Sequence, residues 1–141
     1  MINWLEKNRG VALSLTILIT IEIFHFSSIP GTIGVDIGAG AWIPRIYHFI
    51  VFFLFSFFLF ITIKGDKKIK INYLLTTISI SIIQAILDEV HQMFVPFRYS
   101  SVGDVLTNSL GIFSSILIYL YIDKKNQAHG RKPSPSFLGK I

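Results

Sequence analysis

The fold is decided by the stretch DEVHQMFVPFRYSSVGDVLTNSLG, residues 88–111, which joins two strongly apolar segments. It places two adjacent carboxylates, an amide and an arginine around one hairpin. Insertion scales put the cost of burying a charge in a bilayer at about 2.5–3.5 kcal/mol. Charged groups kept in such a place need a partner or a task, so the stretch marks the candidate functional region.

The composition indicates an integral membrane protein. The chain has 141 residues, of which 52% are hydrophobic and 15% are charged, and its mean hydropathy is +0.62. Soluble domains carry about 25% charged residues. The chain has no cysteine, so disulfides and thiolate metal sites are excluded. Four segments have about the 20 apolar residues that a membrane-crossing helix needs; they are residues 11–29, 46–63, 73–95 and 105–122.

Basic residues predict how these spans are oriented in the cell membrane. Eleven of the 13 lysine and arginine residues lie in the leader, in the loop between the second and third spans, or in the tail. Cytoplasmic loops are enriched in lysine and arginine. We therefore expect both termini inside and the short hairpin between the third and fourth spans outside.

The predicted fold is all-α, a four-helix membrane bundle over residues 1–123. A basic, disordered cytoplasmic tail is expected at residues 124–141, which show no helical periodicity. Residues 1–10 are expected to form a short interfacial leader. The glycine-rich residues 30–44 are expected to be a loop at the outer headgroups, because glycine and proline at this density oppose a helix.

Polar residues near the outer end of each span are the candidates for a functional site. In an alternating topology these ends meet, and their side chains are expected to line one cavity open to the outside. The inner halves are almost wholly apolar, as in residues 51–60, which argues against a channel or a transporter. The candidates are Glu22, His48, Asp88, Glu89, Gln92, Arg98, Asp104 and Asn108.

One hypothesis is a membrane-embedded enzyme, a hydrolase or transferase that acts on a lipid-linked envelope substrate. General acid–base chemistry needs a carboxylate and an imidazole within reach of each other. The sequence has no recognised nucleophile and no diagnostic metal-ligand spacing, so we predict neither a metal nor a cofactor. The candidate catalytic residues are Glu22, His48, Asp88 and Glu89.

The favoured hypothesis is a binding protein, because the catalytic set is incomplete. Its cavity would hold the headgroup of a membrane lipid, and no nucleic acid partner is expected. Arginine suits this task because its planar fork holds a phosphate or carboxylate at two points. The candidate recognition groups are Gln92, Arg98, Asp104 and Asn108.

Three positions of the hairpin also have structural explanations. Ser101-x-x-Asp104 matches a helix capping box. Arg98 can reach phosphate headgroups or balance Asp104. Gly111 is expected to allow close packing of helices, as small residues do in membranes.

The same residues resemble the pattern of the VanZ-like family of small bacterial membrane proteins. That pattern has an acidic pair, glutamine, an aromatic residue, proline and arginine, then serine, aspartate, asparagine and glycine, at the spacing of residues 88–111. RIYHF at residues 45–49 and SSIP at residues 27–30 are similar to two further elements of the family. The resemblance covers about residues 10–122.

The resemblance implies an envelope function linked to antibiotic susceptibility, in which the cavity would hold a lipid-linked cell-wall precursor or the lipid tail of a glycopeptide antibiotic. The family's named member is associated with low-level resistance to glycopeptide antibiotics, teicoplanin above all. Two positions depart from the family: Pro44-Arg45 stands where Asp-Lys is frequent, and Phe52 and Phe53 stand where a tyrosine is frequent. Because arginine does not lose its proton, a mechanism that needs a lysine base there is disfavoured.

Overall fold

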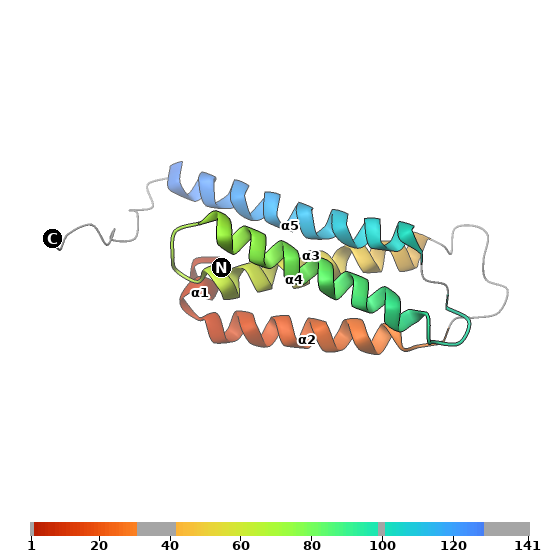
Figure 1. Cartoon of the computed structure of the whole chain (residues 1–141). Helices are drawn as coiled ribbons and strands as arrows, with labels where there is room; N and C mark the ends of the chain where they lie inside the picture. Colours follow the sequence, from red (N-terminus) through yellow and green to blue (C-terminus); the bar gives the residue numbers. More distant parts are fainter. Residues whose placement is uncertain (1, 31–41, 99–100, 129–141) are drawn as a thin grey trace.

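The computed structural model describes residues 2–30, 42–98 and 101–128, and all secondary structure in these ranges is helical. Successive long helices run antiparallel in one bundle, with the short first helix at one end (Figure 1). The predicted all-α fold with four spans is confirmed. The helices are α1 (Ile2–Lys7), α2 (Arg9–Ser27), α3 (Trp42–Lys64), α4 (Ile71–Gln92) and α5 (Val102–Ala128).

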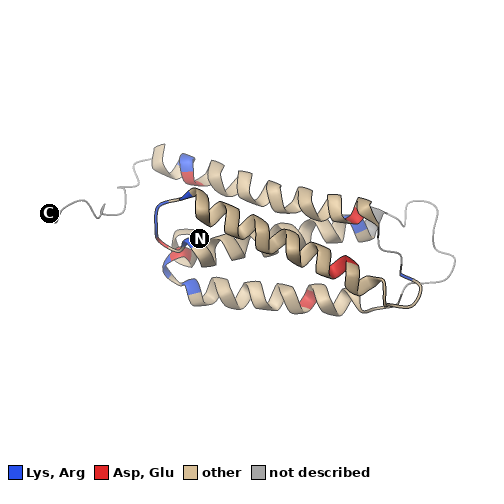
Figure 2. Cartoon of the chain, viewed as in Figure 1, with Lys and Arg blue, Asp and Glu red and all other residues tan. Residues whose placement is uncertain are grey.

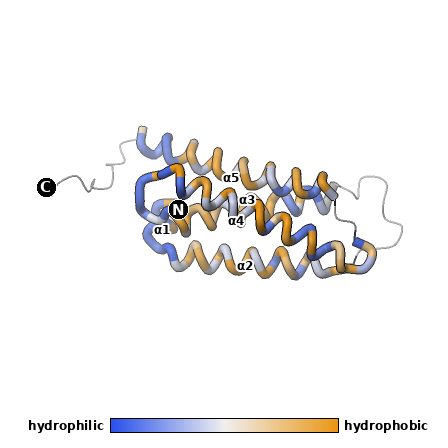
Figure 3. The backbone as a smooth tube through the Cα atoms, in the orientation of Figure 1, coloured by the Kyte–Doolittle hydropathy of each residue, from blue (hydrophilic) through white to orange (hydrophobic). Residues whose placement is uncertain are grey.

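The surface of the bundle is apolar where lipid would cover it. Helices α2 to α5 are each long and apolar enough to cross a membrane, and hydrophobic residues dominate their middle parts (Figure 3). Large apolar side chains such as Leu18, Phe24 and Leu117 point outward and are exposed. Most basic residues gather at the end that holds α1 and the α3–α4 connection (Figure 2). The predicted orientation rests on this asymmetry and stays a prediction.

Helix α3 is the centre of the bundle, because it packs against α1, α2, α4 and α5. Two of its phenylalanines, Phe52 and Phe60, are fully buried. Helix α5 approaches α3 closely at Gly111, where an added Cβ would lie 2.5 Å from the carbonyl oxygen of Phe49. The predicted packing role of Gly111 is confirmed.

A buried ion pair ties α1 to the rest of the bundle. Nζ of Lys64 lies 3.2 Å from Oε1 of Glu6, and the hydroxyl of Tyr119 donates a hydrogen bond to the same oxygen. The guanidinium of Arg9 donates to the carbonyl of Thr62 near the end of α3, at 2.9 and 2.6 Å. Helix α1 is therefore fixed to α3 and α5, where the sequence predicted only an interfacial leader.

The start of α3 corrects one predicted boundary. The helix begins at Trp42, whereas the sequence assigned residues 30–44 to a loop and placed the span at 46–63. Pro44 consequently lies in the first turn, where a helix needs no N–H donor and proline is tolerated. Residues 31–41 of the predicted loop lie outside the described residues.

The end of α5 corrects another boundary. The helix continues past residue 123 to Ala128, so the predicted disordered tail starts too early. Nε2 of Gln127 donates to Oδ2 of Asp123 one turn before it, at 2.6 Å. Lys125 in the last turn suits the negative end of the helix dipole. Residues 129–141 lie outside the described residues.

Candidate functional site

A chain of polar side chains crosses all four long helices at the end of the bundle opposite α1. Nε2 of Gln92 (α4) donates to Oγ of Ser27 (α2) at 3.3 Å and to Oδ2 of Asp88 (α4) at 3.0 Å. The same Asp88 oxygen lies 3.7 Å from Nδ1 of His48 (α3). The carboxamide of Asn108 (α5) lies beside the His48 ring. We call these five buried residues the polar chain; none is more than 5% exposed.

Glu89 joins the polar chain at its centre. One donor atom from each of His48, Asp88 and Glu89 lies within 4.8 Å of the other two, and all three residues are buried. Both carboxylates point inward because they continue the buried stripe of α4, in which Thr77, Ser81 and Ala85 recur every four residues. Small residues in this stripe let α4 lie close to its neighbours.

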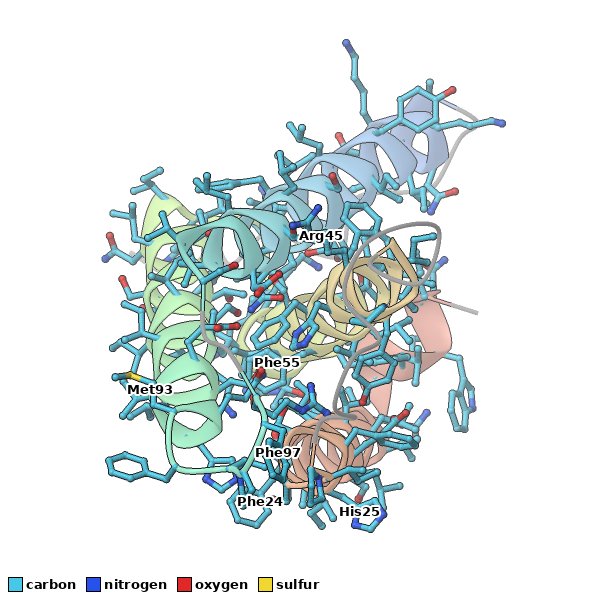
Figure 4. The ribbon with its side chains drawn as sticks, turned by 90° about the vertical axis from the view of Figure 1, so that its right-hand side faces the viewer. Phe24, His25, Arg45, Phe55, Met93 and Phe97 are labelled. Carbon is cyan, nitrogen blue, oxygen red and sulfur yellow. The ribbon has the colours of Figure 1, made fainter. Side chains whose placement is uncertain are left out.

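An ion pair forms the rim above the polar chain. Nε of Arg45 lies 3.8 Å from Oδ1 of Asp104, and the Arg45 side chain is 47% exposed. Arg45 lies between the first turns of α3 and α5 (Figure 4). The candidate set omitted Arg45, although it lies one turn before His48 on the same helix. That spacing was the signal that could have found it.

The N-cap half of the predicted capping box at the start of α5 is confirmed. Oγ of Ser101 accepts a hydrogen bond from the Asp104 backbone N–H at 3.1 Å and donates to Oδ2 of Asp104 at 2.7 Å. Asp104 thus holds the helix start and pairs with Arg45 through its other oxygen. It lies at the rim and outside the polar chain.

Arg98 fastens the α4–α5 connection to the end of α2. Its Nε donates to the carbonyl of Ile29 at 3.0 Å and its terminal nitrogen to the carbonyl of Phe26 at 2.7 Å. These are carbonyls of the kind that a helix end leaves without intrahelical partners. The preceding residue, Phe97, has a positive φ of 59° and lies over α2 (Figure 4). Arg98 therefore binds backbone, whereas Arg45 is the cation that balances Asp104.

Glu22 lies outside the buried cluster, although it is close enough for its charge to act on the Tyr47 hydroxyl, as do those of Asp88 and Arg98. It is exposed on α2, and its carboxylate is not part of the cluster of His48, Asp88 and Glu89. The buried stripe of α2 contains Ile23 and Ser27, and neighbouring positions on a helix differ by about 100°. Burial of the hydrophobic residues of α2 thus sets which face of the helix points into the bundle, and Glu22 lies next to that face and not on it.

Several buried atoms of the polar chain lack a hydrogen bond within the described ranges. They are Nδ1 of His48 and both carboxamide atoms of Asn108. The hydroxyl of Tyr47, next to His48, also lacks a hydrogen bond. Roughly 90% or more of buried polar groups in proteins have a hydrogen-bond partner. Tyr47 was missing from the predicted set because a tyrosine near a membrane interface is unremarkable in sequence.

Fold and site together define a multi-pass helical membrane protein with a polar cluster buried at one end of its bundle. A family model described as VanZ/LLP1 matches residues 3–123. This match covers most of the chain, so the protein belongs to the VanZ/LLP1 family, and the resemblance seen in the sequence is confirmed. No curated protein and no solved structure shows significant similarity to the chain.

Proposed function

We propose that this VanZ-like protein binds the phosphate-bearing headgroup of a membrane lipid or lipid-linked cell-wall precursor. The observation that carries the proposal is the polar chain from Ser27 to Asn108, which draws side chains from all four spans to one end of the bundle. Polar groups inside membrane spans are costly and typically mark functional sites. A bundle that served only as a scaffold would fill these positions with apolar side chains.

Two guanidinium groups at this end of the bundle support a ligand with phosphate oxygens, although one of them, Arg45, also pairs with Asp104. Arg45 is half exposed above the polar chain, and a guanidinium carries five N–H donors that suit phosphate oxygens. Arg98 lies at the same end, in the α4–α5 connection. In the predicted orientation both arginines face the outer leaflet, where envelope precursors are assembled into the wall.

Lower susceptibility to teicoplanin-type glycopeptides is the expected consequence of this binding. Such antibiotics act at the outer face of the membrane on wall precursors. A protein that holds a precursor, a neighbouring lipid or the lipid tail of the drug would reduce productive contact between drug and target. We place the antibiotic effect downstream of binding for this reason.

Native mass spectrometry of the purified protein tests the binding proposal. The wild-type protein should retain an anionic lipid or precursor, and Arg45→Ala should weaken retention by about tenfold or more, because hydrogen bonds to charged groups contribute about 1.5–3 kcal/mol. Lys67→Ala, at the opposite and exposed loop, is the matched control and should retain the ligand. Equal retention in all three proteins, or none in the wild type, would contradict binding at this end.

An enzymatic role is the second candidate, favoured by the contact between His48 and Asp88 at 3.7 Å with Glu89 alongside. General bases act at about 2.6–3.2 Å, and such pairs can tighten when a substrate binds. Incubation with a radiolabelled lipid-linked substrate distinguishes the two functions. Turnover that disappears in Asp88→Asn, while lipid is still retained, would establish an enzyme. Retention without turnover in the wild type would establish a binding protein.

A further inference from the structure

The centre of the polar chain has the donors of a metal site. His48 contributes an imidazole nitrogen, and Asp88 and Glu89 each contribute a carboxylate oxygen, with the three atoms within 4.8 Å of one another. All three side chains are at least nine-tenths buried. They come from two helices that pack together, α3 and α4, so their separation is set by the core of the bundle and not by a loop.

Asn108 supplies a second and independent observation. It is fully buried, its carboxamide lies close enough to the His48 ring to interact with it, and neither atom of that carboxamide has a contact with good hydrogen-bond geometry in the described part of the chain. Nδ1 of His48, the nitrogen that faces Asp88, also lacks one. Buried polar groups are nearly always satisfied by protein, water or an ion, and an amide oxygen is itself a metal ligand.

We propose that His48, Asp88, Glu89 and Asn108 bind a divalent transition-metal ion of the Zn²⁺ or Mn²⁺ type. Imidazole favours such ions over Mg²⁺ and Ca²⁺, which prefer oxygen alone, and the absence of cysteine disfavours soft ions. The two carboxylates carry the charge that balances a dication, so the loaded cluster is close to neutral inside an apolar bundle. This inference is independent of the envelope ligand.

Binding of an ion requires the donors to draw together. Nitrogen and oxygen ligands lie about 2.0–2.2 Å from zinc, so two donors of a tetrahedral site are roughly 3.4 Å apart. The donors of the cluster lie within 4.8 Å of one another, so they would have to approach by about 1 Å. Gln92 donates to Oδ2 of Asp88 at 3.0 Å and thereby orients one of the ligands. Such outer partners hold metal-binding side chains in place.

Metal titration of the purified full chain in detergent tests the site. After removal of metal by a chelator, the protein should bind one Zn²⁺ per chain, measured by elemental mass spectrometry and calorimetry. Asp88→Asn and His48→Ala should weaken affinity by about 100-fold or more, beyond the 10–100-fold typical of outer-shell changes. Asp123→Asn and His25→Ala are the matched controls and should bind metal like the wild type. His25 is exposed, and Asp123 lies near the opposite end of α5 from the cluster.

A spectroscopic measurement avoids dependence on variants that fail to fold. The chain has four histidines, and replacing His25, His91 and His129 with glutamine leaves His48 alone. Electron spin-echo spectra of this protein loaded with Mn²⁺ should show coupling to an imidazole nitrogen. Absence of that coupling, binding well below one ion per chain, or unchanged affinity in folded Asp88→Asn would each overturn the proposal.

Discussion

Nδ1 of His48 lies 3.7 Å from Oδ2 of Asp88, and both side chains are almost fully buried. The imidazole comes from the second turn of α3 and the carboxylate from the last turns of α4, so the contact joins two helices that run in opposite directions (Figure 1). Any change in how α3 packs on α4 would therefore alter the distance between His48 and Asp88 in the polar chain. Stability and function should be measured separately for this reason.

Gly111→Ala should destabilise the bundle by about 1–3 kcal/mol, the usual cost of overpacking a core. The added Cβ would lie 2.5 Å from a backbone oxygen of Phe49, and backbone cannot rotate away as a side chain would. Thermal unfolding in detergent measures the effect. Gly10→Ala is the control, because nothing lies within 4 Å of its added Cβ. Gly10→Ala should be neutral or stabilising, and equal stability of the two variants would argue against the close approach of α5 to α3.

Glu6→Gln should cost about 3–5 kcal/mol, because it removes one partner of a buried ion pair and leaves the Lys64 charge behind. Lys64→Met should cost a similar amount. The double variant Glu6→Gln/Lys64→Met should lose less than the sum of the two, since no uncompensated charge remains. A double-mutant cycle on unfolding free energies gives the coupling directly. Strict additivity would show that Glu6 and Lys64 do not interact.

Arg98→Lys should release the α4–α5 connection from α2 nearly as much as Arg98→Ala does. Arginine reaches two carbonyls with one planar group, whereas lysine offers a single compact charge. Hydrogen exchange in residues 26–29 and 93–98 should therefore rise, by the loss of about 1.5–3 kcal/mol of local protection. Arg45→Lys is the control, because the ion pair of Arg45 is with the Asp104 carboxylate of α5 and not with the carbonyls of α2. Wild-type exchange in Arg98→Lys would mean that charge alone suffices.

Cysteine labelling should establish the orientation. The chain has no cysteine, so each substitution reports one position. Phe94→Cys and Lys68→Cys both lie at exposed positions, at opposite ends of the bundle. A membrane-impermeant reagent added to intact cells should label Phe94→Cys and should reach Lys68→Cys only after the cells are opened. The reverse pattern would place both termini outside.

The spans were predictable because their signal is strong and local. Hydropathy located all four helices, and the buried stripe of α4 follows the periodicity of its polar residues. Helix ends were less predictable. Pro44 looked like a loop residue, yet a first turn accepts proline, and α5 runs on because charged residues near its end suit a helix terminus.

The polar cluster was predictable in part. A shared depth near one end of the bundle brought His48, Asp88 and Asn108 together, as expected from an alternating topology. The depth of a residue in the membrane does not say which way its helix is rotated about its axis, however. Helix α2 is rotated so that Ile23 is buried, and this places Glu22 outside the cluster.

Two features could not be seen along the chain. The donors proposed to bind metal lie on separate helices and follow no recognised motif spacing, so the sequence predicted no metal. Glu6 and Lys64 looked like ordinary charges of a leader and a loop, and only the folded bundle buries them against Tyr119.

The hydrogen bonds of Arg9 to the end of α3 have a consequence for how the chain assembles. They require only the first two spans, which emerge from the ribosome before α4 does. Chains assemble from the N-terminus during synthesis. Asp88 and Glu89 therefore emerge from the ribosome before Asn108, their last neighbour, which follows them in the chain. During synthesis the contact between α2 and α3 can thus form first, and the polar cluster is complete only when α5 has joined the bundle.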